Sequence, residues 1–484
     1  MGRRLAYVIG AVVMAAGVAM VPAAGVSAIY QEWNESLWIL VAAGITVAAG
    51  YVSWRIFGRQ GIVTTKEGFA TVGLAWFALA FFGTLPYLLT GSIGNLTDAF
   101  FETASGFTTT GASVIPDPAV LSKGILFWRS LTQWLGGMGI IVLSLAILPI
   151  LGVGGVQLAR AESPGPELDR LTPRIRDTAK RLWYVYAGIT LIQVIFLVAG
   201  EMDLFQAINH AFTTMSTGGF STEARSVGAF GLYTQWVIIF FMFVAGVSFA
   251  LHYRALTKPG SYFKNTEFLL YTTMVIGAVV IIGGGIWGDS DFVQTLTDSV
   301  FTSVALITTT GFGNADFGQW ESGLQIFIVG LMFLGGMAGS TAGGIKTYRI
   351  GVLTKAASAD LRRLVHPRGV FLTRFGKDVV PDPIVESVQS FFLFFMFLFM
   401  TGTFAMGFIA STLPGAELDL VTSASAVASA LGNIGPGLGD VGPTSNYLGI
   451  PWPGKWLLSF LMMAGRLEIF PVLLLFTREL WRRS

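Results

Sequence analysis

The sequence predicts an all-α membrane protein that crosses the bilayer many times, and three observations support this fold class. The chain of 484 residues is 53% hydrophobic and only 12% charged, with a mean hydropathy of +0.67, whereas soluble domains carry about 25% charged residues. Its many apolar runs are continuous and about 20 residues long, which indicates spanning helices rather than the alternating strands of a membrane barrel. Four short segments that lie between such runs also end alike in glycine.

The first 66 residues predict a pair of membrane helices. Met1-Gly2-Arg3-Arg4 precedes an apolar run that reaches Ala28, and a second run covers 37–57. The first run imitates a secretory signal peptide, but its length of about 25 residues exceeds the 7–15 of a signal core. We therefore expect a retained transmembrane helix.

After residue 66, one three-part pattern occurs four times: an apolar run, a short segment that ends in glycine, and a second apolar run. The predicted units are 67–160, 161–258, 259–380 and 381–484. Each middle segment is too short to span the bilayer, so we expect it to enter the membrane and return on the same side. Glycines also recur in the last apolar run of every unit, at Gly137, Gly246, Gly336 and Gly465. Agreement across four units indicates internal repeats.

The four glycine-ended segments are the strongest functional signal in the sequence. They are Thr108-Thr109-Thr110-Gly111, Ser216-Thr217-Gly218-Gly219, Thr308-Thr309-Thr310-Gly311 and Gly432-Asn433-Ile434-Gly435. Glycine tolerates positive φ and places no Cβ beside its neighbours, so backbone carbonyls can turn toward a common axis. Four such strips around a central pore would offer carbonyl oxygens to a dehydrated cation, and the hydroxyls would add hard ligands suited to alkali ions. The alternative is a set of ordinary helix caps.

Glycines in the last apolar run of unit three predict a broken helix. They are Gly335, Gly336, Gly339, Gly343 and Gly344, with Ser340 and Thr341 among them. Unwound backbone at membrane depth needs partners from protein or from a water-filled cavity, so we expect a flexible loop that acts as a gate below the glycine-ended segments. Close helix packing through small residues is the alternative. The pattern is not a phosphate-binding loop, because Ile345 separates Gly344 from Lys346.

A single arginine lies inside the apolar run 457–476. An intramembrane arginine is costly and usually faces the bundle interior. There, Arg466 would repel cations and donate hydrogen bonds to the freed carbonyls of the loop, which makes it part of the expected gate. A pair between Arg466 and Glu468 is the alternative. Lys346 could contribute to the gate from the cytoplasmic edge, or it could snorkel.

The charge distribution predicts the orientation of the chain. Of the 30 lysines and arginines, 25 fall on one side of the predicted topology, and the positive-inside rule places that side and both termini in the cytoplasm. The glycine-ended segments then open outward, beside the acids Asp98, Glu102, Asp298 and Asp316. An acidic mouth would gather cations, although a scatter of outer acids is the plainer interpretation.

The remaining residues argue against other classes. The chain has no cysteine, which removes thiolate chemistry. Its histidines, His210, His252 and His366, are scattered, so we expect no enzyme, and His210 is expected to make a structural hydrogen bond. The basic stretches 154–181 and 354–383 could dock an acidic regulatory partner or only set the topology. We expect no nucleic-acid partner and no organic cofactor.

Taken together, these motifs resemble the TrkH/KtrB/HKT superfamily of potassium transporters over nearly the whole chain. The resemblance is carried by the four glycine-ended segments, the break at 335–344, Gly465-Arg466-Leu467-Glu468-Ile469-Phe470 and the loop 161–175. The additional N-terminal helix pair is similar to the TrkH/TrkG branch, whereas KtrB resembles the four units alone.

This resemblance implies a fold and a mechanism. It implies four helix–pore loop–helix units around a central ion pore, a homodimer in the bacterial cytoplasmic membrane, and a TrkA-like cytoplasmic nucleotide-binding ring as gating partner. It also implies that the glycine-rich loop and Arg466 form the gate. In plant HKT relatives a serine at the first filter glycine accompanies sodium preference, so Gly111 favours potassium as the transported ion. Gly218 and Asn433 depart from the threonine pattern, which leaves a sodium-permeable relative or a cation–proton symporter as alternatives.

Overall fold

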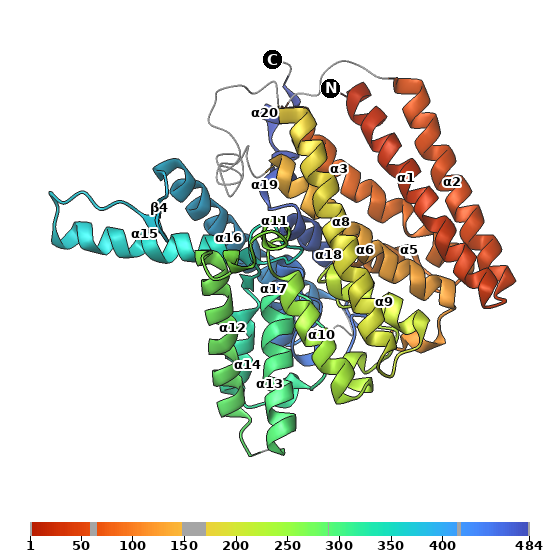
Figure 1. Cartoon of the computed structure of the whole chain (residues 1–484). Helices are drawn as coiled ribbons and strands as arrows, with labels where there is room; N and C mark the ends of the chain where they lie inside the picture. Colours follow the sequence, from red (N-terminus) through yellow and green to blue (C-terminus); the bar gives the residue numbers. More distant parts are fainter. Residues whose placement is uncertain (1, 59–64, 148–170, 289, 414–417, 483–484) are drawn as a thin grey trace.

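The computed structural model describes residues 2–58, 65–147, 171–288, 290–413 and 418–482. These residues are mostly helical (Figure 1). Within them, six helices are long and apolar enough to cross a membrane, or seven if one bent pair counts as a single span. The predicted all-α membrane fold is confirmed.

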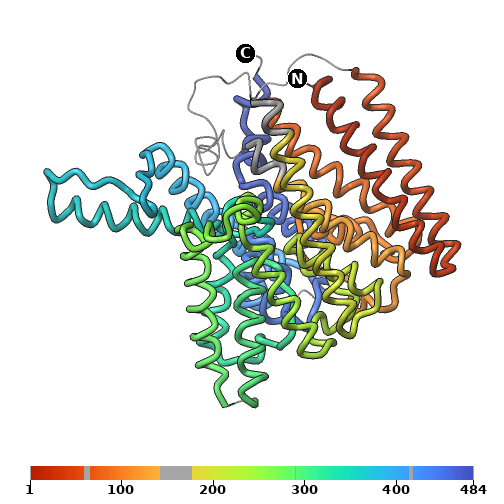
Figure 2. The backbone as a smooth tube through the Cα atoms, in the orientation of Figure 1, coloured from red at the N-terminus to blue at the C-terminus, as the bar shows by residue number. Residues whose placement is uncertain are grey.

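The N-terminal pair consists of α1 (Gly2–Ile29) and α2 (Trp33–Phe57). The two helices lie side by side at the edge of the molecule (Figure 2). They approach closely at two glycines, because a Cβ added to Gly10 would lie 2.8 Å from the carbonyl oxygen of Gly50. Small residues allow such close contact between membrane helices. α1 also packs against α3 and α6, which attaches the pair to unit one.

Units one and two share the order of a first helix, a short helix, a glycine-ended segment, a 3-10 turn and a last helix. Unit one contains α3 (Thr65–Phe82), α4 (Leu85–Thr90), α5 (Leu96–Phe107), η1 (Pro118–Val120) and α6 (Lys123–Ile147). Unit two contains α8 (Leu171–Val198), α9 (Leu204–Met215), η3 (Ser226–Ala229), α10 (Leu232–Ala245) and α11 (Phe249–Ala255).

Units three and four repeat this order with additional elements. Unit three contains η4 (Pro259–Ser261), α12 (Thr266–Gly285), α13 (Phe292–Ile307), η5 (Phe317–Gln319), α14 (Ser322–Leu331), β1 (Leu334–Gly335), β2 (Ile345–Lys346), α15 (Thr347–Val365), β3 (Arg374–Phe375) and β4 (Asp378–Val379). Unit four contains α16 (Asp382–Thr412), α17 (Leu420–Gly432), η6 (Gly439–Val441), α18 (Trp452–Arg466), α19 (Phe470–Leu474) and α20 (Arg478–Trp481).

The short helices α5, α9, α13 and α17, called the re-entrant helices below, all begin in the same way. An Asn or Asp side chain at each start accepts a hydrogen bond from a backbone N–H one turn later. The capping residues and distances are Asn95 (2.8 Å), Asp203 (2.7 Å), Asp291 (3.2 Å) and Asp419 (2.6 Å). Such caps satisfy backbone N–H groups that have no partner within the helix.

Among the described residues, the last helix is broken in units two, three and four, whereas the sequence predicted a break only in unit three. α10 and α11 meet at 98°, and the carbonyl freed at Gly246 accepts a hydrogen bond from the N–H of Met337 at 2.8 Å. α18 ends at Arg466, and Glu468 and Ile469 then both have φ of 63°. The sequence did not predict the breaks in units two and four. In unit two, backbone hydrogen bonds from Met337 to Gly246 (2.8 Å) and from Phe249 to Gly339 (3.1 Å) replace the lost helical bonds.

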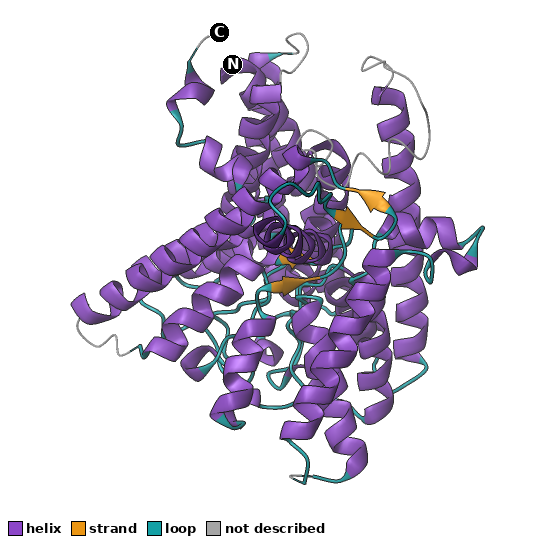
Figure 3. Ribbon diagram, turned by 90° about the vertical axis from the view of Figure 1, so that its left-hand side faces the viewer, coloured by secondary structure: helices purple, strands orange, loops and turns teal. Residues whose placement is uncertain are grey.

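The predicted break of unit three is confirmed as a loop between α14 and α15. β1 and β2 pair in parallel within it, with Leu334 opposite Ile345 and Gly335 opposite Lys346 (Figure 3). α15 then leaves the body of the molecule sideways (Figure 1). β3 and β4 form a small antiparallel pair beyond it.

Candidate functional site

The four glycine-ended segments share one backbone conformation. In each, the N–H of the third residue folds back onto a carbonyl of its own re-entrant helix. These bonds are Thr110 to Ser105 (2.9 Å), Gly218 to Thr213 (2.8 Å), Thr310 to Ala305 (2.9 Å) and Ile434 to Ser429 (3.0 Å). The second and fourth residues have positive φ, as in Thr109 (52°) and Gly111 (86°) of unit one. Because these N–H groups point back to the helix, the carbonyl groups of the same segments are free to face away from it.

The segments meet in a closed ring. A Cβ added to each terminal glycine would contact a carbonyl oxygen of the neighbouring segment. The four pairs are Gly111 with Gly218, Gly219 with Thr310, Gly311 with Ile434, and Gly435 with Thr110. The fourth segment thus returns to the first, and the structure brings together four loops that lie far apart in the sequence. Ordinary helix caps do not require such convergence.

The threonine hydroxyls of the ring are engaged unequally. Those of Thr110 and Thr310 bond to the hydroxyls of Thr108 and Thr308 at 2.8 and 2.7 Å. The Thr109 hydroxyl is buried and has no hydrogen-bond partner among the described residues. The hydroxyls of the four segments therefore differ in their surroundings, and their role as additional ligands stays a prediction.

Asn433 joins unit four to unit one. Its Nδ2 donates to the Thr110 hydroxyl at 3.0 Å and to the carbonyl of Met462 in α18 at 2.8 Å. Asn433 also has φ of 55°, a left-handed conformation that asparagine tolerates better than most residues. Asn433 thus stands where the segments of the other three units have a threonine, and the ring remains closed.

The loop between β1 and β2 lies directly against this ring. The N–H of Gly343 donates to the Thr309 hydroxyl at 2.6 Å, and a Cβ on Gly343 would overlap the carbonyl oxygen of Gly432. The Thr341 hydroxyl donates to the carbonyl of Met215 at 3.0 Å. The loop therefore contacts units two, three and four where their re-entrant helices end.

Contacts within the loop explain its small residues. A Cβ on Gly335 would overlap the carbonyl oxygen of Gly343, while Gly339 and Gly344 have φ of 79° and 63°. Ser340 donates to the carbonyl of Met337 at 2.6 Å. These glycines are required by turns and by close backbone contact.

Two further contacts complete the loop. A Cβ on Gly336 would lie 2.6 Å from the carbonyl oxygen of Gly246. Lys346 is 7% exposed and its Nζ donates to the carbonyl of Ala342. Lys346 therefore binds the loop and does not snorkel.

Arg466 also binds this loop. Its side chain is 2% exposed, and Nη1 donates to the carbonyl of Thr341 at 2.7 Å. The predicted hydrogen bond from Arg466 to a freed loop carbonyl is confirmed. Glu468, the alternative partner, forms an ion pair with Arg349 at 2.5 Å.

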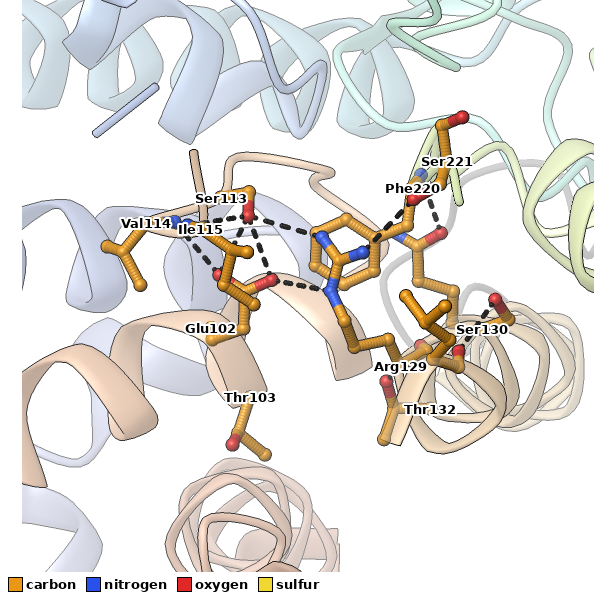
Figure 4. A network of polar contacts seen from close by, with 12 residues as sticks. Glu102, Thr103, Ser113, Val114, Ile115, Arg129, Ser130, Thr132, Phe220 and Ser221 are labelled. Carbon is orange, nitrogen blue, oxygen red and sulfur yellow. Dashed lines mark hydrogen bonds and ion pairs between the residues drawn. The ribbon is translucent and has the colours of Figure 1, made fainter. Parts of the chain in front are cut away.

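Two of the four acids that the sequence placed at the mouth are paired with buried cations. Glu102 is fully buried and pairs with Arg129 at 2.8 Å (Figure 4), and Asp98 pairs with Lys455 at 2.5 Å. Asp298 accepts from Asn314 at 2.7 Å. The interpretation of an open acidic mouth was therefore wrong for Asp98 and Glu102, because each carboxylate has a buried cationic partner.

Further acids and His210 have structural partners as well. Asp316 accepts a hydrogen bond from the N–H of Gly318 at 3.1 Å. His210 contacts the Gln206 carbonyl at 2.9 Å and the Ser221 hydroxyl at 3.0 Å, as expected for a structural histidine.

Arg129 and Gln133 are site residues that the sequence reasoning missed. Arg129 donates to the carbonyl of Ser221 at 3.1 Å and to the hydroxyl of Ser113 at 3.2 Å, so it links the chain after segment one to that after segment two. The signal for Arg129 was present, since it is one of few cations on the outer side of the predicted topology. No such signal marked Gln133.

Four re-entrant helices whose ends meet in one ring, inside a bundle of apolar helices, define a pore-loop type of membrane protein. The family model for TrkH, described as a cation transport protein, matches residues 39–271 and 262–483. The chain belongs to this TrkH family, which confirms the resemblance drawn from the sequence; the family is one of transporters and not of enzymes.

Individual relatives match the whole chain. It is similar to the Trk system potassium uptake protein TrkH of Halomonas elongata, with 39% identity over 99% of each chain. It is 36% identical to the Escherichia coli K12 protein of the same name, again over 99% of each. The crystal structure of the potassium transporter TrkH from Vibrio parahaemolyticus superposes with a TM-score of 0.90 at 33% identity, covering 100% of both chains.

Proposed function

We propose that this protein takes up potassium across the bacterial cytoplasmic membrane through a selective, gated, channel-like pore. The closed ring of four glycine-ended segments is the observation that carries the proposal. Rings of backbone carbonyls replace the hydration shell of a potassium ion. The names of the relatives, potassium uptake proteins and a potassium transporter, point to the same ion.

The ring residues are the proposed ion-binding residues. They are Thr109, Thr110, Gly111, Thr217, Gly218, Gly219, Thr309, Thr310, Gly311, Asn433, Ile434 and Gly435. Potassium is the transported ion and the only metal in the proposal. Since backbone oxygens are the main ligands, the ring can bind an alkali ion without a buried carboxylate.

The loop below the ring is the proposed gate. Its residues are Gly335, Gly336, Gly339, Ser340, Thr341, Gly343, Gly344 and Lys346, together with Arg466. The contact of Gly343 with Thr309 supports this role, since a loop against the ring obstructs the path of an ion. Arg466 adds a buried positive charge at the same place, which repels cations.

The proposals for gate regulation and for subunit assembly rest on the family resemblance. We propose a homodimer and a TrkA-like cytoplasmic nucleotide-binding ring that controls the gate. α15, which begins directly after the loop, carries the exposed residues Arg362 and Arg363 and supports such docking. The stretch 154–170, part of the other basic segment expected to dock a partner, lies outside the described residues.

The proposed organisation keeps the predicted boundaries: a helix pair in 1–66 and pore units in 67–160, 161–258, 259–380 and 381–484. Both termini are placed in the cytoplasm by the positive-inside rule. The start of α1 and α20 lie at the same end of the molecule (Figure 1), which supports this placement. A membrane potential of about 100 mV, inside negative, favours entry of one cation by about 2.3 kcal/mol.

A sodium-permeable pore or a cation–proton symporter is the second candidate. Gly218 and Asn433 break the symmetry of the threonine pattern, and imperfect symmetry supports weaker discrimination between cations. Both candidates use the same ring.

Flux into proteoliposomes tests the proposal. Purified protein in vesicles with an imposed potassium diffusion potential is expected to take up rubidium, with sodium entering more slowly and without a dependence on the pH gradient. Uptake that requires an inward proton gradient would favour symport, and equal sodium and rubidium entry would favour the sodium-permeable alternative. Growth of a potassium-uptake-deficient bacterium at low potassium, with and without a co-expressed TrkA-like partner, tests the regulatory part.

A further inference from the structure

The second glycine-ended segment differs from the others at Gly218. Its equivalents are Thr110, Thr310 and Ile434, so this unit alone has no side chain there. The φ of Gly218 is not positive, unlike that of Gly219 at 76°. The backbone would therefore accept an L-residue at this position, and the reason for glycine lies in its surroundings.

Gln133 of α6 occupies the space beside Gly218. A Cβ added to Gly218 would overlap Cδ and Oε1 of Gln133 and would lie 2.8 Å from its Nε2. Gln133 is fully buried and belongs to unit one, while Gly218 belongs to unit two. The side chain that the second segment lacks is thus supplied by the neighbouring unit.

Both ends of the Gln133 amide are hydrogen-bonded to the second segment. Nε2 donates to the carbonyl of Gly218 at 2.8 Å, and Oε1 accepts from the N–H of Phe220 at 3.1 Å. A backbone N–H can only donate and a carbonyl can only accept, so these partners determine which way the amide points. The bonded residues Gly218 and Phe220 are the two chain neighbours of Gly219, so the amide fixes the backbone on both sides of that glycine.

The Gly218 carbonyl differs from its equivalents in the ring. Among the described residues, no side chain donates a hydrogen bond to the carbonyl of Thr110, Thr310 or Ile434. The Gly218 carbonyl oxygen lies against Gly111 and also accepts the hydrogen bond from the Gln133 amide. An oxygen that a second residue fixes by a hydrogen bond cannot easily move to contact a smaller ion.

We propose that Gln133 is a positioning residue that holds the Gly218 carbonyl at the radius for potassium and so limits sodium entry. The inference rests on the proposed function, since it deepens the account of that ring. Selectivity in carbonyl rings depends on the size of the cavity and on the number and field strength of the oxygens. Loss of the Gln133 bond lets the second strip move toward the axis, which favours the smaller ion.

Substitution of Gln133 tests the proposal through the ratio of sodium to rubidium flux in proteoliposomes. Q133L keeps the volume and removes both hydrogen bonds, and we expect the ratio to rise about fivefold, the factor that one buried hydrogen bond of ordinary strength carries. Q133E keeps the acceptor for Phe220 but loses the donor to Gly218, and it is also expected to raise the ratio. The matched control is Q193L, which replaces a buried glutamine of α8 that has no hydrogen-bond partner among the described residues; its ratio is expected to stay at the wild-type value.

A reciprocal pair of variants tests the same idea without relying on the stability of Q133L. G218T should disturb the ring because the new side chain overlaps Gln133, whereas Q133A/G218T removes that overlap and restores the threonine of units one and three. We expect the double variant to recover rubidium flux that G218T loses, because the overlap is gone, and to keep a raised sodium-to-rubidium ratio, because the bond from residue 133 to the carbonyl of residue 218 is missing.

The outcomes separate this inference from the proposed function. The inference is overturned if the wild type prefers rubidium to sodium and the sodium-to-rubidium flux ratio is unchanged in Q133L and Q133E. The proposed function would then still stand. A double variant with the wild-type ratio also overturns the inference, since that ratio would then not need the Gln133 bond. Absence of any rubidium uptake by the wild type overturns the proposed function, and the inference with it.

Discussion

At Gly111, the backbone angle and the neighbouring segment both exclude a side chain. Its φ is 86°, and a Cβ would overlap the Gly218 carbonyl oxygen. We therefore expect Gly111→Ser to push apart two of the four strips and to raise sodium flux relative to rubidium flux in proteoliposomes. Gly91→Ser is the matched control, because Gly91 also has positive φ (74°) but nothing lies within 4 Å of its added Cβ. Equal selectivity in wild type and Gly111→Ser would remove Gly111 from the ion pathway.

Arg466 combines burial, charge and a bond to the loop. Its substitution by alanine removes the hydrogen bond to the Thr341 carbonyl and the cation that opposes permeation. Arg466→Ala is therefore expected to increase rubidium leak in proteoliposomes that lack any regulatory partner. Arg478→Ala serves as the control, because Arg478 is exposed in α20. Basal leak at the wild-type level in Arg466→Ala would argue against Arg466 as part of the gate.

Between elements, the pair of Glu102 in α5 and Arg129 in α6 joins a re-entrant helix to the last helix of its unit. Both side chains are nearly inaccessible, at 0% and 2% exposure, so removal of one leaves the other charge buried. Arg129→Leu is expected to lower the free energy of unfolding by about 3–5 kcal/mol, measured as thermal or denaturant unfolding in detergent.

The control for this prediction is an exposed ion pair. Arg363 and Asp360 are 49% and 56% exposed, and such pairs contribute about 0–1 kcal/mol. Arg363→Leu should therefore leave stability almost unchanged. Similar losses for both variants would show that burial does not determine the contribution of the Glu102–Arg129 pair.

In the whole molecule, each unit supports the next. Gly137 of unit one contacts Ser216 of unit two, Gly246 contacts Thr308 of unit three, and Gly343 contacts Gly432 of unit four. Each of these glycines allows close approach to the end of a neighbouring re-entrant helix. The ring is therefore held by contacts that pass from unit to unit, and no single unit contains a complete site.

Orientation is also a property of the whole molecule, and the absence of cysteine in the sequence makes it directly testable. S445C introduces a thiol at an exposed residue beyond the ring, and K258C introduces one on the opposite, basic side. In intact cells a membrane-impermeant maleimide should label S445C and not K258C, and both should react after lysis. Labelling of K258C alone in intact cells would reverse the proposed topology.

Local composition was sufficient to predict the membrane class and the four short helices, because apolar length and glycine position depend on neighbours in the chain. It also marked the break at 335–344, where five glycines cannot maintain a helix. The break at Gly246 was not predictable in this way, since it depends on backbone hydrogen bonds with the distant residues Met337 and Gly339. The turn after Arg466 was not predicted either, although its backbone hydrogen bonds are local.

Sequence alone determined that this is a multi-span membrane protein with four glycine-ended segments and a buried arginine, since these features follow from the types and order of its residues. Only the tertiary structure decided that the segments close into one ring, that Glu102 and Asp98 are neutralised by Arg129 and Lys455, and that Gln133 takes the place of a side chain at Gly218. The physical reason is that close contacts and buried charges are satisfied by partners far away in the chain, and the spacing of residues does not specify which partners meet.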